Sequence, residues 1–441
     1  MPTVARVRWG LLCLLLILCG HRALAQGGYS VTDLGFIEQW YSETHGLNNG
    51  GWVVGEYEPV GALYQHAFLY NGQTTISLAI EPDVYTIAWG INDSNIVVGE
   101  YLPKRNPFII EAFQYSNGVV TRLGFLSSSS YSSAHAINQL GQIVGESSTN
   151  STGSVIHAVL WVNGTNVDLG VLGGNYSSAT AINSSGIIVG ESSVEGSANV
   201  QAFIYTNSIA PLGTLGGDYS TAKSINDAGV VVGESTEVNG GVTNLQAFVY
   251  QNGSMTSLGA QATALGADSS SASAINNLGQ IVGYLGFGQL NQAFLFDGTN
   301  MVNLIQYVPP SSGFANLSSA YGINDHGQII GSGTLINGDY HGYLLTPSNP
   351  WIFLSAPALV SGSGFQMNIQ SIPGVQFVVQ MSTNLCSTSN WVSLYTNVFT
   401  GFQTNYTDLD ATNCGARYYR ALLLPPTFGS FSQHSHSILR Q

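Results

Sequence analysis

The stretch Ile137-Asn138-Gln139-Leu140-Gly141-Gln142-Ile143-Val144-Gly145-Glu146 is the clearest copy of a phrase that occurs seven times in this 441-residue chain. Each copy has an Asn after an aliphatic residue, a short turn, a β-branched run and a closing Gly seven residues after the Asn. Successive copies lie 43 to 50 residues apart, a period typical of propellers, solenoids and other arrays of stacked units. The repeated asparagines are Asn48, Asn92, Asn138, Asn183, Asn226, Asn276 and Asn324.

One unit, residues 131–174, shows why we expect four antiparallel strands per copy. Residues 134–137 and 142–146 predict two strands joined by a turn, in which Gly141 can take the positive φ that such turns require. After a Ser/Thr/Gly-rich loop, residues 157–161 predict a third strand, and an Asn-Gly turn leads to a fourth at residues 166–169. Four short antiparallel strands make one blade of a β-propeller.

The two ends of the repeat region complement each other. Residues 29–35 have the pattern of a fourth strand with no unit before it, whereas the seventh unit stops after its third strand at Leu344-Leu345. Pairing the first strand with the last unit would complete seven four-stranded sheets and leave only short, protected edges. We therefore predict an all-β fold in which residues 26–346 form a seven-bladed β-propeller closed by N-terminal strand exchange.

Several phrases resemble the HAF repeat of bacterial extracellular proteins. They are Ala-Ile-Asn-x-x-Gly-x-Ile-Val-Gly, the His-Ala-Phe-Leu-Tyr of residues 66–70 and the Leu-Gly-Thr-Leu-Gly-Gly of residues 212–217, and the likeness covers about residues 28–346. The first and seventh copies are the weakest, and only His66 and His157 keep the His-Ala pair. The resemblance implies an exported repeat protein and supplies no established catalytic residues.

The pattern changes after a Pro-containing linker at residues 347–350. Alternating apolar stretches between residues 365 and 422 predict a small β-sandwich at residues 351–425, followed by a polar tail at residues 426–441. Ser382-Thr383-Asn384-Leu385, Trp391, Asp408 and Arg417-Tyr418-Tyr419-Arg420 resemble a fibronectin-like module that ends many secreted bacterial proteins. Such a module implies a spacer or a surface-association domain.

The N-terminus has the pattern of a secretory signal peptide. Arg6 and Arg8 precede a short apolar stretch, and Ala23-Leu24-Ala25 is a small-residue cleavage site, so we expect residues 1–25 to be removed. Lipid attachment at Cys19 is the alternative, but the bulky Leu18 before it fits that modification poorly. We expect a secreted or extracellular protein with no transmembrane segment, and association with the cell surface stays open.

Charge and cysteine content fit export. The formal net charge is −14, and removal of residues 1–25 takes away three Arg and no acidic residue, which leaves seven basic against 24 acidic residues and a net charge of −17. Such a chain repels phosphate backbones, so nucleic acid is not an expected partner. Only Cys386 and Cys414 remain after cleavage, and in an oxidising compartment we expect them to form a disulfide.

The sequence lacks the common catalytic and cofactor motifs. It contains no Gly-x-Ser-x-Gly elbow, His-Glu-x-x-His helix, phosphate loop or dinucleotide fingerprint, and we expect no cofactor. Asp408, Asp410 and Asn413 form a fragment of a calcium loop that lacks its Gly and its distant Glu. A polar turn is the simpler interpretation of that fragment.

Two sets of repeated positions are candidate binding residues, because sevenfold repetition would arrange each set as a ring. The first set lies three residues before each Asn and varies between bulky and polar types inside a frame of small residues. Such variation is expected of a binding surface, whereas the alternative is that these side chains only fill or solvate the mouth of a central channel. The set is His45, Trp89, His135, Thr180, Lys223, Ser273 and Tyr321.

The second set directly follows the closing Gly. Five equivalent carboxylates would attract a cation or a basic partner, but a charge at a strand end is more often a solvated guard of the sheet edge, and we favour that interpretation. Tyr284 and Ser332 replace the acid in the last two units. The five weak candidates for a metal site are Glu56, Glu100, Glu146, Glu191 and Glu234.

These features favour a non-catalytic extracellular binding or scaffold protein, a monomer that presents a propeller face to a glycan or a protein. The alternative is a secreted propeller hydrolase or lyase that acts on polysaccharide. Such an enzyme would need a pair of acids in non-repeated positions on one face. The acids are embedded in the repeat or scattered, and no sialidase-type Asp box occurs, so we expect no enzymatic activity.

Overall fold

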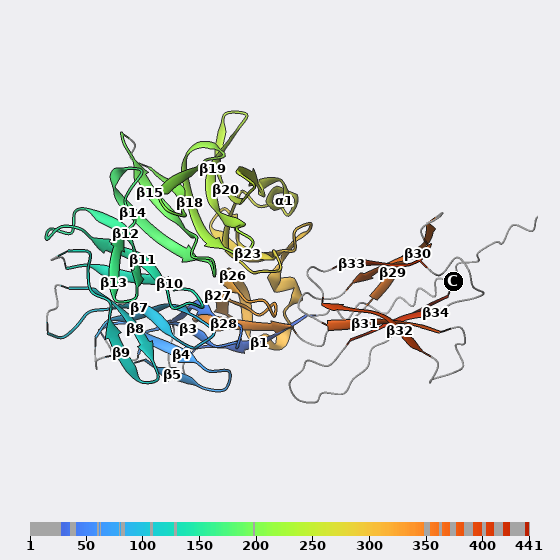
Figure 1. Cartoon of the computed structure of the whole chain (residues 1–441). Helices are drawn as coiled ribbons and strands as arrows, with labels where there is room; N and C mark the ends of the chain where they lie inside the picture. The colour runs from blue at the N-terminus through green and yellow to red at the C-terminus, as the bar shows by residue number, and fades with distance from the viewer. Residues whose placement is uncertain are drawn as a thin grey trace, which may run out of the picture.

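The structure is a computed structural model, and it describes residues 28–35, 41–59, 61, 63–78, 80, 84–105, 109–127, 130–196, 199–347, 353–360, 364–370, 376–382, 391–398, 403–409, 418–423 and 437–440. The chain is all-β, which confirms the predicted class. Across these ranges, the helical elements are one short α-helix and two 3-10 helices: α1 (Gly259–Ala264), η1 (Leu304–Tyr307) and η2 (Pro310–Ser312). Figure 1 shows the strands in two regions, one on each side of residue 350.

Residues up to 347 form sets of four strands that follow the sequence repeat, with one parallel bridge joining the third and fourth sets. The strands predicted at residues 134–137, 142–146, 157–161 and 166–169 are confirmed as β10 to β13. The first three sets are β2 (Ser42–Leu47), β3 (Val53–Tyr57), β4 (His66–Tyr70), β5 (Thr75–Ser77); β6 (Thr86–Ile91), β7 (Val97–Tyr101), β8 (Glu111–Ser116), β9 (Val119–Arg122); and β10 (Ser132–Ile137), β11 (Ile143–Ser148), β12 (Ile156–Val162), β13 (Thr165–Asp168). The next three are β14 (Gly173–Ile182), β15 (Ile188–Val194), β16 (Val200–Tyr205), β17 (Ile209–Gly213); β18 (Gly216–Ile225), β19 (Val231–Asn239), β20 (Val242–Gln251), β21 (Ser254–Ser257); and β22 (Ser269–Ile275), β23 (Ile281–Phe287), β24 (Leu290–Phe296), β25 (Met301–Asn303).

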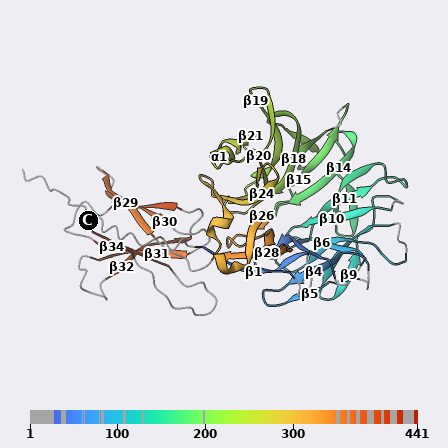
Figure 2. The same cartoon turned by 180° about the vertical axis from the view of Figure 1, so that it is seen from behind.

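The last set combines strands from both ends of this region. β26 (Phe314–Ile323), β27 (Ile329–Leu335) and β28 (Tyr340–Pro347) pair in order, and β1 (Tyr29–Asp33) lies antiparallel beside β28. Figures 1 and 2 show blue β1 against orange β28 from both sides. Nδ1 of His341 lies 2.9 Å from Oδ1 of Asp33, so a side-chain contact joins residues 308 positions apart.

A closed ring of asparagines links the sets. The first strand of each set packs against the first strand of the next, and β26 packs against β2. Oδ1 of Asn138 accepts the N–H of Gln142 in its own turn at 3.0 Å, and its Nδ2 donates to the carbonyl of Asn183 at 3.0 Å. The Nδ2 bonds run Asn48, Asn92, Asn138, Asn183, Asn226, Asn276, Asn324 and back to Asn48. All seven side chains are buried. Each repeated Asn therefore satisfies backbone hydrogen-bonding groups of its own turn and links that turn to the turn of the next set.

The closing Gly of the phrase leaves no room for a side chain. A Cβ at Gly145 would lie 2.0 Å from the backbone oxygen of Ser133, and a comparable clash occurs at all seven closing glycines. Gly141, by contrast, has open space around it and a φ of 78°, as its turn requires. The two glycines of the phrase are therefore there for different reasons.

Small and apolar side chains fill the space between neighbouring sets. Between the fourth and fifth sets, Val189 and Ala202 pack with Val231 and Phe248, and none of the four is accessible to solvent. This arrangement explains the recurring Ala-Phe in the third strand, because the small residue lets the aromatic ring of the adjacent sheet approach.

The C-terminal strands form two further sheets. Their orders are β29-β30-β33 and β32-β31-β34-β35, and the ring of Phe365 stacks on that of Tyr419 at 4.7 Å between centroids in their shared core. β35 lies inside the segment predicted as a polar tail and pairs with β34. The bounds are β29 (Phe353–Val360), β30 (Gly364–Gln370), β31 (Gln376–Ser382), β32 (Val392–Val398), β33 (Gln403–Asp408), β34 (Tyr418–Leu423) and β35 (Ser437–Arg440).

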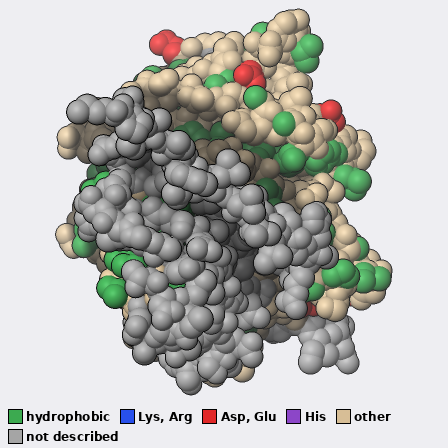
Figure 3. Space-filling model, turned by 90° about the vertical axis from the view of Figure 1, so that its right-hand side faces the viewer, with side chains coloured by type: hydrophobic (Ala, Val, Ile, Leu, Met, Phe, Trp, Pro, Cys, Tyr) green, Lys and Arg blue, Asp and Glu red, His purple; other side chains and the backbone are tan. Residues whose placement is uncertain are grey.

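Several predictions lie outside the described residues. They concern the signal peptide at residues 1–25, the cysteines Cys386 and Cys414, the linker residues 348–350, and Asp410 and Asn413 of the calcium-loop fragment. Within the described ranges, no helix is long and apolar enough to cross a membrane. On the described part of the face in Figure 3, acidic side chains occur singly, with hydrophobic side chains scattered between them.

Candidate functional site

A β-bulge occurs at the same place in the first strand of every set. In β10, Ala134 lies opposite Gly145 and Ala136 lies opposite Val144, so His135 between them is skipped. A bulge re-aims a side chain without ending the strand, which explains why this position tolerates any residue type. The seven skipped residues are the first set predicted from sequence, and we call them the bulge ring: His45, Trp89, His135, Thr180, Lys223, Ser273 and Tyr321.

Members of the bulge ring reach toward the adjacent set. The rings of His45 and Trp89 lie 4.4 Å apart between centroids, and those of Trp89 and His135 lie 6.3 Å apart. Thr180 Oγ1 donates to the carbonyl of Ala222 at 2.7 Å. All seven side chains are partly exposed. The structure thus brings these predicted residues together as neighbours around the axis.

The five repeated glutamates accept hydrogen bonds from tyrosines. Each Tyr lies 15 residues before its Glu, as in the 2.9 Å bond from Tyr85 to Glu100. Glu56, Glu100, Glu146 and Glu234 are only 6–8% exposed, so their interpretation as solvated edge guards is wrong. The two sets without the Glu also lack the Tyr. The pairs are Tyr41–Glu56, Tyr85–Glu100, Tyr131–Glu146, Tyr176–Glu191 and Tyr219–Glu234.

In the fifth set, an internal ammonium group completes such a pair. Nζ of Lys223 lies 2.8 Å from Oε2 of Glu234 and 2.9 Å from Oγ of Ser271, while Tyr219 donates to Oε1 of Glu234 at 3.1 Å. Burial acts to raise the pKa of Glu234, but the Lys223 charge and hydrogen bond outweigh it and lower that pKa. The two predicted sets of residues therefore come together in this set, because Lys223 of the bulge ring is hydrogen-bonded to Glu234, one of the repeated glutamates.

The first set carries an additional carboxylate. Glu43 lies directly opposite Glu56 in the β2–β3 pairing. The Tyr41 hydroxyl lies 2.7 Å from Oε2 of Glu43 and 3.3 Å from Oε1 of Glu56, so one hydroxyl lies between two acids. Like charges directly opposite each other destabilise a strand pair, a cost that the other sets avoid. The equivalent residues there are Ile87, Ser133, Ser178, Thr221, Ser271 and Ser319.

The environment of Glu56 changes its protonation. Burial raises the pKa of Glu56 to about 7, with the charges of Glu43 and Glu100 adding to the effect and the Tyr41 hydrogen bond opposing it. Burial also lowers the pKa of His45 to about 4, despite the nearby Glu43, so His45 is neutral at pH 7. Within the described part of the chain, Oε2 of Glu56 and Nε2 of His45 are buried without a hydrogen-bond partner.

A cavity of about 240 Å³ lies at the other end of the axis, where the Asn turns meet. Its wall includes a ring of aliphatic residues before each Asn and a ring of polar residues after it. The polar ring is bonded to itself, as where the Asn49 N–H donates to Oδ1 of Asp93 at 2.8 Å and the Ser184 N–H donates to Oδ1 of Asp227 at 2.9 Å. The carboxylates of the polar ring therefore form hydrogen bonds that join neighbouring turns.

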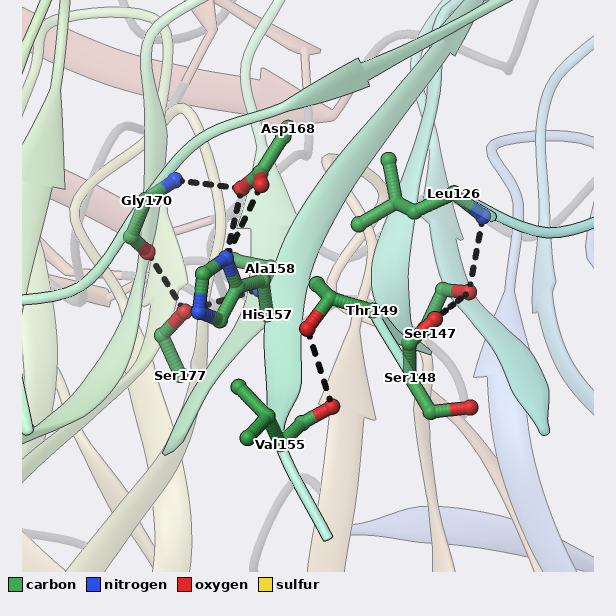
Figure 4. A network of polar contacts seen from close by, with 10 residues as sticks. All are labelled: Leu126, Ser147, Ser148, Thr149, Val155, His157, Ala158, Asp168, Gly170 and Ser177. Atoms are coloured by element: carbon green, nitrogen blue, oxygen red, sulfur yellow. Dashed lines mark hydrogen bonds and ion pairs between the residues drawn. The ribbon is translucent and has the colours of Figure 1, made fainter. Parts of the chain in front are cut away.

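His157, Asp168 and Ser177 have the composition of a catalytic triad but a structural role (Figure 4). Nδ1 of His157 lies 2.9 Å from both carboxylate oxygens of Asp168. The Ser177 hydroxyl donates to the carbonyl of Gly170 at 2.6 Å and accepts the N–H of Ala158 at 2.8 Å. Because Ser177 is fully buried and its proton is already bound, it is not an available nucleophile.

The calcium-loop fragment gains no support from the part of it that is described. Asp408 is buried and accepts the Tyr419 hydroxyl at 2.8 Å, as expected of a core hydrogen bond. Among the described residues, no group of three or more His, Cys, Asp or Glu side chains is arranged to hold a metal ion.

Comparison with known proteins gives a likeness of fold. No family model matches the chain, and no curated protein matches it. Among solved structures, it is similar to the β-propeller domain of the Trilobed protease from Pyrococcus furiosus, a domain described as having an open velcro topology. The sequence identity is 8% and the TM-score is 0.46, and the match covers 70% of this chain and 94% of that one.

Proposed function

We propose that this protein is a secreted, non-catalytic binding or scaffold protein, built on a seven-bladed β-propeller that its own N-terminal strand closes. The sets of four strands, the β1–β28 pairing and the closed ring of asparagines support this blade count and closure. The two C-terminal sheets with one shared core support a small β-sandwich after the propeller. The signal-peptide pattern and the resemblance to HAF repeats support export.

The observation that carries the binding function is the bulge ring. A bulge at every equivalent position turns side chains of different chemistry toward the next set, while the flanking residues stay small. A frame that holds variable, partly exposed aromatic and polar groups in a ring suits recognition of an extracellular glycan or protein.

A glycan array combined with a protein-capture assay tests this function on the full mature chain. Trp89→Thr gives the second set the bulge-ring residue of the fourth, and Tyr64→Thr removes an exposed aromatic ring elsewhere as the matched control. We expect a bound ligand whose affinity falls at least tenfold with Trp89→Thr and is unchanged with Tyr64→Thr. Absence of any ligand, or equal loss in both variants, would contradict the proposal.

One observation favours the polysaccharide hydrolase as a second candidate. Glu43 occupies a non-repeated position, and it lies on the same sheet face as Glu56, whose pKa is raised to about 7. A carboxyl group with a raised pKa beside a second acid is what the general acid of a glycoside hydrolase requires. Against it, Oε2 of Glu56 is buried. Release of reducing ends by the wild type, abolished by Glu43→Gln and by Glu56→Gln, would establish this candidate and exclude the non-catalytic one.

A further inference from the structure

We propose that the Glu43–Glu56 pair of the first set binds a primary ammonium group of the ligand. This inference deepens the proposed function and rests on it, because His45 of the bulge ring lies 4.0 Å from Glu56 and its ring packs on that of Trp89. It names the chemistry that one part of the ring recognises.

The pair is incomplete as it stands. Glu43 and Glu56 face each other across two strands, and Oε2 of Glu56, a residue only 6% exposed, has no hydrogen-bond partner among the described residues. A buried acceptor without a partner and two opposed carboxylates are both costly. A cation placed between the acids would remove both costs at once. The neighbouring His45 cannot supply it at neutral pH, because burial keeps the imidazole uncharged.

The fifth set shows which cation the frame accepts. There the same Tyr–Glu arrangement holds the Lys223 ammonium, which donates to Glu234 and to Ser271 at 2.8 and 2.9 Å. Lys223 and His45 occupy equivalent bulge positions. In the first set, Glu43 supplies a second acceptor at the strand position that Thr221 holds in the fifth. In the fifth set the chain itself provides the ammonium group, from Lys223, whereas in the first set a ligand would provide it.

The surroundings suit an alkylammonium better than a metal ion. Glu43, Trp89 and Tyr321 are partly exposed, so a cation can approach the pair from the side of Glu43, and the aromatic rings offer faces that attract an organic cation. Calcium needs six to eight oxygen ligands, whereas an ammonium group needs three acceptors. No cluster suited to a metal occurs here within the described residues. A lysine side chain of a protein and an amino sugar both present this group.

Calorimetric titration of the full mature chain at pH 8 with n-butylammonium tests the site, with n-butanol as the uncharged analogue. Glu43→Ser gives the first set the residue of the third and fourth sets, and Glu195→Gln removes an exposed carboxylate as the charge-matched control. We expect one butylammonium per chain, at least tenfold weaker binding to Glu43→Ser, unchanged binding to Glu195→Gln and none of n-butanol.

Equal binding of butylammonium to wild type and Glu43→Ser, or no binding to wild type, would overturn the inference. If circular dichroism shows that Glu43→Ser is unfolded, the same titration of Glu43→Gln decides instead. A lysine peptide and a glucosamine oligomer, each beside its N-acetylated form, distinguish the two sources. If a neutral glycan binds but butylammonium does not, this inference fails and the proposed function stands; if no probe binds, both fail.

Discussion

Replacing Asn183 with Ala perturbs the asparagine ring at one link. Oδ1 of Asn183 accepts the N–H groups of Ser185 and Ile187 at 3.1 and 2.9 Å, and its Nδ2 donates to the carbonyl of Asn226 at 3.2 Å. The substitution therefore removes three hydrogen bonds at a residue that is only 4% exposed. It also leaves backbone groups of two different sets without their partner.

The expected cost follows from these bonds. Each contributes about 1 kcal/mol to the free energy of unfolding, so Asn183→Ala should cost about 3 kcal/mol. Asn175→Ala is the matched control, because it removes an exposed Asn side chain from β14, the strand that ends just before Asn183, and should stay within about 0.5 kcal/mol of the wild type.

Urea unfolding of the mature chain, followed by tryptophan fluorescence, measures both changes. Asn183→Asp separates the two halves of the role, because it keeps the acceptors of the turn but replaces the donor to Asn226 with an oxygen. If the link between sets matters, Asn183→Asp at neutral pH should also be destabilised. A cost below about 1 kcal/mol for Asn183→Ala would refute the view that the ring holds the sets together.

Three other predictions concern the frame and the first set. Gly145→Ala should cost more than about 4 kcal/mol or prevent folding, whereas Gly141→Ala should cost about 1 kcal/mol from its positive φ alone, and equal shifts in melting temperature would contradict this. Deleting residues 26–36 removes β1 and leaves β28 without its outer partner, so the melting temperature should fall and the transition should become less cooperative. An unchanged melting curve would exclude closure by this strand. Because folding raises the pKa of Glu56, this residue lowers the free energy of unfolding as pH rises from about 4.5 to 7. Because folding lowers the pKa of His45, that residue raises the free energy of unfolding as pH rises from about 4 to 6.5. The two contributions nearly cancel in the wild type. His45→Gln removes one of them, so the melting temperature of this variant should fall from pH 5 to 7 because of Glu56 alone. An unchanged melting temperature over that range would exclude the raised pKa of Glu56.

The strands and turns could be predicted because their causes are local. Alternating apolar residues, a Gly that can take positive φ and an Asn-Gly turn all act within a few positions of the chain, as in β10 to β13. The partner of Asn138 could not be predicted in the same way, because the carbonyl it meets belongs to Asn183 in the next set. Nothing near Asn138 in the sequence indicates that contact.

The candidate site was predicted in part. The bulge ring was found by its variability, but the bulge itself depends on strand pairing, which a single strand does not reveal. The Tyr–Glu pairs were missed although the spacing of 15 residues recurs in five units, as between Tyr85 and Glu100. Glu43 could not be found from the repeat, because its signal is a departure from it: Glu43 is the one acid at a position where the other units carry Ile, Ser or Thr.

The location of Glu43 couples the candidate site to closure of the fold. Tyr41 of the first set stacks on Tyr340 of the last set with 6.0 Å between ring centroids, and burial together with the charge of the nearby Glu43 raises the pKa of Tyr321 in the last set. The last set is the one that β1 completes. A ligand held by Glu43 would thus contact groups from both ends of the repeat region and would bind only when those ends are joined. Since anything that binds only the folded form stabilises it by mass action, occupation of the pair would strengthen closure, and loosening β1 would weaken binding.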